Sequence, residues 1–258
     1  VGVKAICDII EEKVVRVQDV LEKQGKKRPE GYFRGDTDYK RMCERDDIDI
    51  VITATPWKLH TPICLAAMKA GKHAATEVPA ALTIDECWQL VETSEKYNKY
   101  CIMIENCCYG QAEMMVLNMV RQGFLGELLH GECGYMHDLR NLKLTNAYEG
   151  MWRLKYAMKH NGNPYPTHGL SFVAQCMNIN RGDRLDYIVS MSSKSKGLNL
   201  YAKDKLGADS EYAKQKYVLG DVNSSLIKTA NGLTIVLQHD THNPRPYSRI
   251  NIVQGTKG

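Results

Sequence analysis

Short apolar runs alternate with helical patterns along residues 1–105. The runs at 1–8, 47–56, 72–77 and 100–105 are continuous, which is typical of strands buried on both faces of a parallel sheet. Helical patterns cover 11–24, 61–70 and 83–97, and the last of these opens with Thr83 and Glu86 in the spacing of a capping box. This strict alternation predicts an α/β domain with helices on both faces of a parallel sheet.

The pattern changes after Asn106. Helices are predicted over 111–122 and 168–177, and a strand over 128–137. Later segments alternate with period two, and Asn231-Gly232 is a strong hairpin signal between two of them. These segments are 186–192, 223–228, 234–239 and 248–253. We therefore expect a second domain, of the α+β class, with an open antiparallel sheet.

Composition narrows the class of protein. The 258 residues are enough for one to two domains, and a net charge of +4 is spread along the chain without a basic run, so nucleic acid is not an expected partner. No apolar stretch approaches the roughly 18 residues of a membrane helix, so no membrane span is expected. Nine Cys without a CxxC pair predict reduced thiols and folding in a reducing compartment, although a lost signal peptide and export stay open.

Asp8 ends the first apolar run. A carboxylate at the end of an early strand is the usual partner of the ribose hydroxyls of a dinucleotide, and the alternative is that it caps the next helix. The glycine-rich turn that binds the pyrophosphate lies about 20 residues before such an acid. We therefore expect that turn upstream of Val1, and interpret the sequence as a fragment that starts after it.

Three segments carry a family resemblance. Residues 53–62 (TATPWKLHTP), 70–74 (AGKHA) and Glu77-Val78-Pro79 resemble the Gfo/Idh/MocA oxidoreductases. That family pairs a nicotinamide-binding Rossmann domain with an open-sheet domain, which implies an N-terminally truncated cofactor domain over 1–108. It also implies a C-terminally truncated substrate and oligomerisation domain over 109–258, with homo-oligomers formed through the open sheet. Dehydrogenases of the family usually have Lys where this chain has Val78, and valine cannot move a proton.

Val78 and three further segments are similar to glycoside hydrolase family 109. The segments are 105–110 (ENCCYG), 134–137 (GYMH) and 162–169 (GNPYPTHG). The resemblance implies an exo-acting α-N-acetylgalactosaminidase that keeps a bound NAD and acts on a carbohydrate or glycoconjugate. It assigns to the cofactor Asp8, Trp57, Lys58, Leu59, His60, Glu77, Val78 and Asn106. It assigns to the sugar Tyr135, His137, Tyr165, Pro166, Thr167, His168 and Tyr247.

The implied mechanism oxidises sugar carbon 3, removes the proton at carbon 2, eliminates the aglycone, adds water and reduces the ketone again. It needs two proton-transfer groups, and the candidates are His168, Tyr165, Tyr135, His137 and Glu105. Each has a plainer interpretation. His168 suits a helix start, Tyr135 and His137 share a strand face that could be solvated, and Glu105 could instead pair with a histidine or bind a sugar hydroxyl.

Two other aromatic or imidazole features have ordinary explanations. Trp57 either packs near the nicotinamide or is a core aromatic. His239 and His242 flank Asp240 without a third ligand at metal-site spacing, so no metal is expected. The alternatives to a hydrolase are a sugar or inositol dehydrogenase of the parent family and a non-catalytic sugar or dinucleotide sensor.

Overall fold

The computed structural model describes residues 2–146 and 149–258, in two compact units, Val1–Ile104 and Glu105–Gly258. Val1, at the start of the first predicted strand, lies outside the described residues. The sequence predicted the border after Cys108. Residues 105–108 instead belong to the second unit, because Glu105 bonds to His168 and Cys108 packs in the core of that unit.

The first unit contains two pieces of parallel sheet. One joins β1 (Ala5–Cys7) to β2 (Glu30–Tyr32), and the other has the order β3 (Ile50–Thr53), β4 (His73–Thr76), β5 (Cys101–Met103). The helices are α1 (Glu11–Lys23), α2 (Asp38–Cys43), a 3₁₀ turn (Trp57–Leu59), α3 (His60–Lys69) and α4 (Ile84–Tyr97). The parallel α/β prediction is confirmed, whereas β2 and α2 were not predicted because each is too short to show a period.

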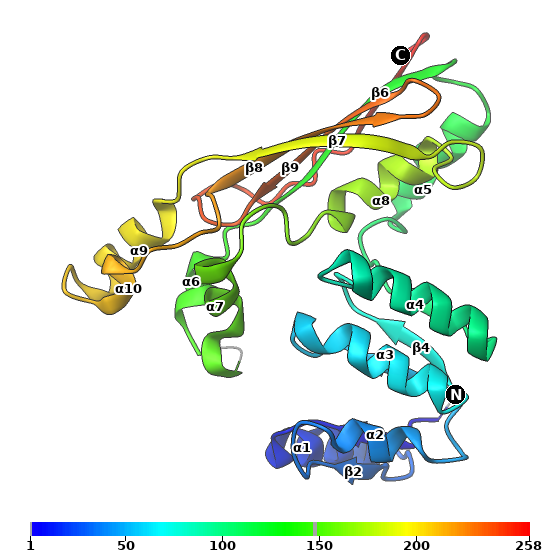
Figure 1. Ribbon diagram of the computed structural model, residues 1–258, viewed down its shortest axis with the longest axis vertical. Helices are drawn as coiled ribbons and strands as arrows, with labels where there is room; N and C mark the ends of the chain where they lie inside the picture. Colours follow the sequence, from blue (N-terminus) through cyan, green and yellow to red (C-terminus); the bar gives the residue numbers. More distant parts are fainter. Residues whose placement is uncertain (1, 147–148) are drawn as a thin grey trace. The chain divides into compact units, whose positions relative to one another are not determined.

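Helix α3 carries the core of this unit, and it lies beside α4 in Figure 1. Ala67 and Met68 on α3 are fully buried among residues that include Val51 and Ala74 of the neighbouring strands. The predicted capping box at the start of α4 is confirmed, since Thr83 Oγ1 accepts from the backbone of Glu86 and the Glu86 carboxylate accepts from the backbone of Thr83.

The second unit is built on a five-stranded sheet in the order β10-β6-β9-β8-β7. Its strands are β6 (Leu128–Met136), β7 (Leu185–Ser192), β8 (Val222–Thr229), β9 (Thr234–Asp240) and β10 (Ile252–Gly255). Its helices are α5 (Gln111–Arg121), α6 (Arg140–Leu144), a 3₁₀ turn (Glu149–Met151), α7 (Trp152–Lys159), α8 (Thr167–Cys176), α9 (Gly197–Leu206) and α10 (Glu211–Lys214).

The sheet is mixed, whereas a wholly antiparallel one was expected. The β8–β9 hairpin is antiparallel, as predicted, but β6 pairs with β9 in parallel. Between β6 and β9 the chain passes through several helices and two strands, so no tight turn forces the two strands to run in opposite directions.

One face of this sheet is covered and the other is open. Helices α5 and α8 lie on the same side of the sheet (Figure 1), where Phe172 and Val173 of α8 pack against Ile235 and Leu237 of β9. Among the described residues, no helix is long and apolar enough to cross a membrane.

Candidate active site

Strand β6 and the start of α8 bring three of the predicted rings together. The Tyr135 ring lies 4.7 Å from that of His168 and 5.2 Å from that of Tyr165, measured between centroids. Tyr165 and His168 are stacked at 5.0 Å with an interplanar angle of 7°. The YPTH segment therefore faces the strand that carries Tyr135 and His137, and the predicted sugar residues form one aromatic cluster.

Two glycines allow this close approach. A Cβ on Gly169 of α8 would lie 2.4 Å from the backbone nitrogen of Gly134 on β6, which is closer than real Cβ atoms come to other atoms. Any larger residue at Gly169 would push the helix away from the strand. His168 and Tyr135, each next to one of these glycines, would then separate.

Glu105 and His168 form a buried pair. His168 Nδ1 lies 2.9 Å from Glu105 Oε1, with the side chains 10% and 3% exposed, and the same oxygen accepts from the backbone N–H of Cys107 at 2.7 Å. Burial would raise the pKa of Glu105, but the hydrogen bonds from His168 and Cys107 hold it below its usual value. The carboxylate only accepts, so Nδ1 carries a proton, and in the neutral ring Nε2 is left able to accept another.

Tyr135 and His137 form a second pair on the same strand face, as predicted. Tyr135 Oη lies 2.6 Å from His137 Nδ1. Burial raises the pKa of Tyr135 and lowers that of His137, so the phenol is protonated and donates to a neutral imidazole. Tyr247 stands perpendicular to His137 at 5.0 Å between centroids, and half of it is exposed.

Two buried oxygens, one on a predicted sugar residue and one on a predicted catalytic residue, have no hydrogen-bond partner among the described residues. The hydroxyl of Thr167 and Oε2 of Glu105 are buried and make no hydrogen bond within the described part of the chain. Pro166 precedes the first residue of α8 and so helps to set the direction in which that helix starts. Unpartnered oxygens beside aromatic rings suit a site for a hydroxyl-rich ligand.

Arg153 is a site residue that the sequence reasoning missed. Its Nη1 donates to Tyr165 Oη at 2.6 Å, and its guanidinium lies 4.4 Å from the ring centre of Trp152. It places a permanent positive charge next to the aromatic cluster. The only sign of it in the sequence was a basic residue next to Trp152 in a stretch rich in aromatic residues. No periodicity there indicated that the Arg153 side chain points toward Tyr165.

The predicted cofactor residues of the first unit follow the carboxyl ends of parallel strands. Asp8 comes directly after β1, and Glu77 and the buried Val78 come after β4. Dinucleotides bind at this edge of a parallel sheet, so the placement fits NAD. Asp8 Oδ1 also accepts from the backbone N–H of Ile10 at 2.9 Å, so part of the helix-capping alternative holds as well.

Most of the predicted cofactor residues in the segment after β3 pack inside the first unit or bond to its backbone. Trp57 is buried, Leu59 packs against the core of the first unit, and Lys58 is exposed. His60 was expected to touch the cofactor, but it is 1% exposed and its ring nitrogens lie 2.7 and 2.8 Å from the carbonyl oxygens of Pro79 and Thr55. It ties α3 to the ends of two strands and has no free nitrogen for a ligand.

Asn106, the last predicted cofactor residue, belongs to the second unit, where its side-chain oxygen accepts from Cys107 Sγ at 3.0 Å. Within the described ranges, Glu105, Cys107 and His168 place potential metal ligands within 4.8 Å of one another. No metal was expected here. The carboxylate of Glu105 and the imidazole of His168 already form a hydrogen-bonded pair with each other at 2.9 Å.

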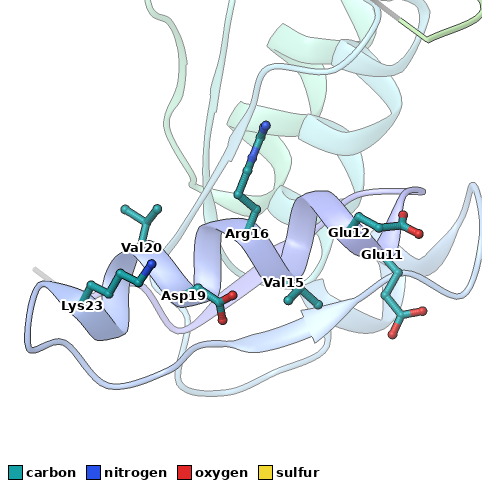
Figure 2. Close-up of a pocket in the computed structure, with 7 residues that line it drawn as sticks. All are labelled: Glu11, Glu12, Val15, Arg16, Asp19, Val20 and Lys23. Atoms are coloured by element: carbon teal, nitrogen blue, oxygen red, sulfur yellow. The ribbon is translucent and has the colours of Figure 1, made fainter.

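A shallow hollow along the exposed face of α1 contains none of the predicted residues. Figure 2 shows its lining side chains, most of them charged. They are Glu11, Glu12, Val15, Arg16, Asp19, Val20 and Lys23. Charged side chains of both signs along a solvated helix face need no ligand to explain them.

Two known protein families match the chain, one over each of the two units. Residues 3–105 match the oxidoreductase family with an NAD-binding Rossmann fold, and residues 109–258 match the C-terminal domain of glycosyl hydrolase 109. A glycosyl hydrolase family 109 protein of Shewanella baltica is 54% identical, and an alpha-N-acetylgalactosaminidase of Shewanella oneidensis is 53% identical. Each match covers 100% of this chain and 56% of the relative, so the chain spans about half the length of these proteins.

Solved structures agree on the fold. A probable dehydrogenase from Thermotoga maritima gives a TM-score of 0.72 at 18% identity, covering 99% of this chain and 67% of that one. A scyllo-inositol dehydrogenase from Lactobacillus casei with bound NAD(H) and scyllo-inositol gives 0.72 at 16% identity, covering 99% and 66%. At these identities the likeness concerns the fold alone.

Proposed function

The chain belongs to glycosyl hydrolase family 109, and on that premise we propose that the protein removes terminal α-N-acetylgalactosamine from carbohydrates or glycoconjugates. Its first unit is an NAD-binding Rossmann-fold domain, and NAD is its cofactor. The relative of the same family named alpha-N-acetylgalactosaminidase supports this substrate class. Bound NAD would supply reversible hydride transfer at sugar carbon 3, so the cofactor undergoes no net change.

The observation that carries the proposal is the presence of two separate hydrogen-bonded pairs of titratable side chains in one aromatic cluster. His168, oriented by Glu105, presents Nε2 as one acceptor, and Tyr135 with His137 forms the other pair. Oxidation at carbon 3 and proton removal at carbon 2 need groups at different atoms. The guanidinium of Arg153 and the unpartnered hydroxyl of Thr167 would orient the sugar.

Val78 favours hydrolysis over net dehydrogenation. It is buried two residues after the end of β4, where an ordinary dehydrogenase of this fold uses a lysine to move the hydroxyl proton. A valine leaves that work to the second unit.

A cofactor balance tests the function. The full-length protein is incubated with an aryl α-N-acetylgalactosaminide, and released aglycone and NADH are followed together. We expect aglycone to accumulate in many-fold excess over NADH. One NADH per product from a free sugar would identify a dehydrogenase, and tight sugar binding without any product would identify a sensor.

We also propose that the open sheet face joins two copies of the chain. Val189 of β7 pairs with Leu226 of β8, which pairs with Val236 of β9, so the three side chains share the face opposite α8. Val189 and Leu226 are both more than half exposed. An apolar stripe across adjacent strands is typical of a surface that a protein partner covers. In a two-fold dimer the same surface of both copies forms the interface, so the stripe of one copy can pack against the stripe of the other.

Light scattering after gel filtration tests this surface. Leu226→Lys should convert the oligomer to monomers, because a lysine cannot be buried in an apolar interface without a partner. Trp88→Glu is the matched control, since Trp88 is equally exposed but lies on α4 of the first unit. A wild-type protein that is monomeric at all concentrations would overturn the proposal.

A further inference from the structure

Lys143 is a buried lysine that the proposed chemistry does not yet use. It lies on α6 and is 5% exposed, and its Nζ donates to Thr241 Oγ1 at 2.7 Å. An ammonium has three donors and loses much hydration energy on burial. A buried lysine held by a single hydroxyl is therefore poorly arranged to serve as a permanent structural cation.

Two buried histidines close to Lys143 have no hydrogen-bond partners. Neither ring nitrogen of His239 or of His242 is bonded within the described residues, although both side chains are almost fully buried. His242 Nδ1 lies 3.4 Å from Asp221 Oδ1, within ion-pair distance, and that oxygen makes no hydrogen bond to any described residue. Buried polar atoms without partners are costly, so these imidazoles are candidates for a role beyond packing.

His239 connects this group to the sugar site. It is the direct partner of Tyr135 in the β6–β9 ladder, so both side chains lie on the same sheet face. Their rings are stacked with centroids 6.3 Å apart. Beside Tyr135 there is thus an imidazole with both nitrogens unbonded within the described residues. Thr241, which accepts from the buried Lys143 amine, follows His239 by two residues.

The charged groups that act on Lys143 lie on or next to four different elements. Arg153 of α7 disfavours its charged form, while Asp240 of β9, Asp221 before β8 and Asp138 before α6 favour it. Burial, together with Arg153, outweighs the three carboxylates and lowers the pKa of Lys143 to about 7. Burial and the charge of Lys143 also lower the pKa of His242 to about 4 and that of His239 well below its usual value.

We propose that Lys143 stores a proton for the sugar site, exchanging it with the Tyr135–His137 pair through His239. The inference rests on the proposed function, in which protons are taken from the sugar and later returned. When the pair gives up a proton, Nζ gains one proton and one positive charge, and it gives both back when the sugar is protonated again. No electron is transferred, and Lys143 touches no reacting atom.

Two substitutions of Lys143 distinguish a role in proton exchange from a role in packing and from a role as a fixed positive charge. Lys143→Met has a similar length and never carries a proton, whereas Lys143→Arg always carries one. If Lys143 exchanges protons, both variants should lower kcat by about 10- to 10²-fold, toward the lower end of the usual effect of acid–base groups, with KM little changed. A structural cation would tolerate Arg, and an apolar filler would tolerate Met.

The pH profile provides the second readout. In the wild type, kcat/KM should rise as pH increases through about 7, because Nζ must be unprotonated to accept, and this limb should be absent in both variants. Lys72→Met is the matched control, because Lys72 is also buried but lies in the first unit. Thermal unfolding of each variant confirms that it is folded.

The outcomes are distinguishable from failure of the proposed function. If the wild type releases no N-acetylgalactosamine, the function itself is wrong. If the wild type is active and either variant keeps its kcat and the limb near neutral pH, the function stands and the proton-storage proposal is overturned.

Discussion

Replacing Glu105 by Gln should slow the enzyme through His168. The substitution keeps the shape of the side chain and removes only its charge. Glu105 is 3% exposed and lies 2.9 Å from His168 Nδ1, so its charge acts on the imidazole with little screening by water. In the proposed mechanism, that charge would stabilise the imidazolium that forms when Nε2 takes a proton from the sugar.

The size of the effect follows from this geometry. A buried hydrogen bond to a charged group contributes about 1.5–3 kcal/mol, which corresponds to roughly 10- to 10²-fold in rate. The backbone N–H of Cys107 keeps an oxygen at the Oε1 position of the amide, so Nδ1 can still donate and the tautomer is retained. We therefore expect kcat to fall by that factor, less than the roughly 10²- to 10⁴-fold loss for His168→Ala.

The assay measures kcat and KM on an aryl α-N-acetylgalactosaminide, together with absorbance of reduced cofactor in a single turnover. A loss confined to KM would show that His168 only holds the sugar, and proton transfer would pass to His137 and Tyr135. In a single turnover, His168→Ala should prevent NADH from forming if His168 serves the oxidation, and should make it accumulate if His168 serves a later step.

A double-mutant cycle checks that Glu105 acts through His168. Glu105→Gln combined with His168→Ala should be no slower than His168→Ala alone, because the charge then has nothing to stabilise. Glu113→Gln is the control, since Glu113 is a partly buried carboxylate of the same unit that lies 3.8 Å from Arg249 instead. The reasoning would be refuted if the loss of kcat in the double mutant equalled the product of the two single losses. An unchanged kcat for Glu105→Gln would refute it as well.

Four further predictions concern other parts of the chain. Asp8→Ala should narrow the preference for NAD over NADP by about tenfold in direct titration, because like-charge repulsion of the 2′-phosphate is lost; unchanged relative affinities would remove Asp8 from the ribose site. Val78→Lys should not speed release of aglycone, and urea unfolding should show a loss of about 1–3 kcal/mol from placing a lysine at a buried site. Thr83→Ala should cost about 1 kcal/mol in the same measurement by removing the capping box, while Thr83→Ser should cost little. The free energy of unfolding should fall as pH decreases from about 6.5 toward 4. The pKa of His242 is depressed in the folded protein, so the unfolded chain binds more protons in that range. His242→Asn should weaken this pH dependence.

Much of the local structure could be read from the sequence. The capping box at Thr83 was visible because its two hydrogen bonds join residues three apart. Tyr135 and His137 were placed on one face because alternate residues of a strand always share a face, and they do form a hydrogen bond. Such features depend on a few neighbouring residues, and those residues are adjacent in the sequence.

The site itself depended on contacts between distant segments. The parallel pairing of β6 with β9, which sets His239 beside Tyr135, joins residues that no periodicity links. The contact of Arg153 with Tyr165 and the burial of Lys143 were also invisible, because a charged residue in a short helix is normally solvated. The sequence alone determined many of the longer strands and helices, since hydrophobic period and capping are local, whereas β2 and α2 are too short to show a period. Only the tertiary structure decided which charges lose their water, because burial is set by the packing of elements far apart in the chain.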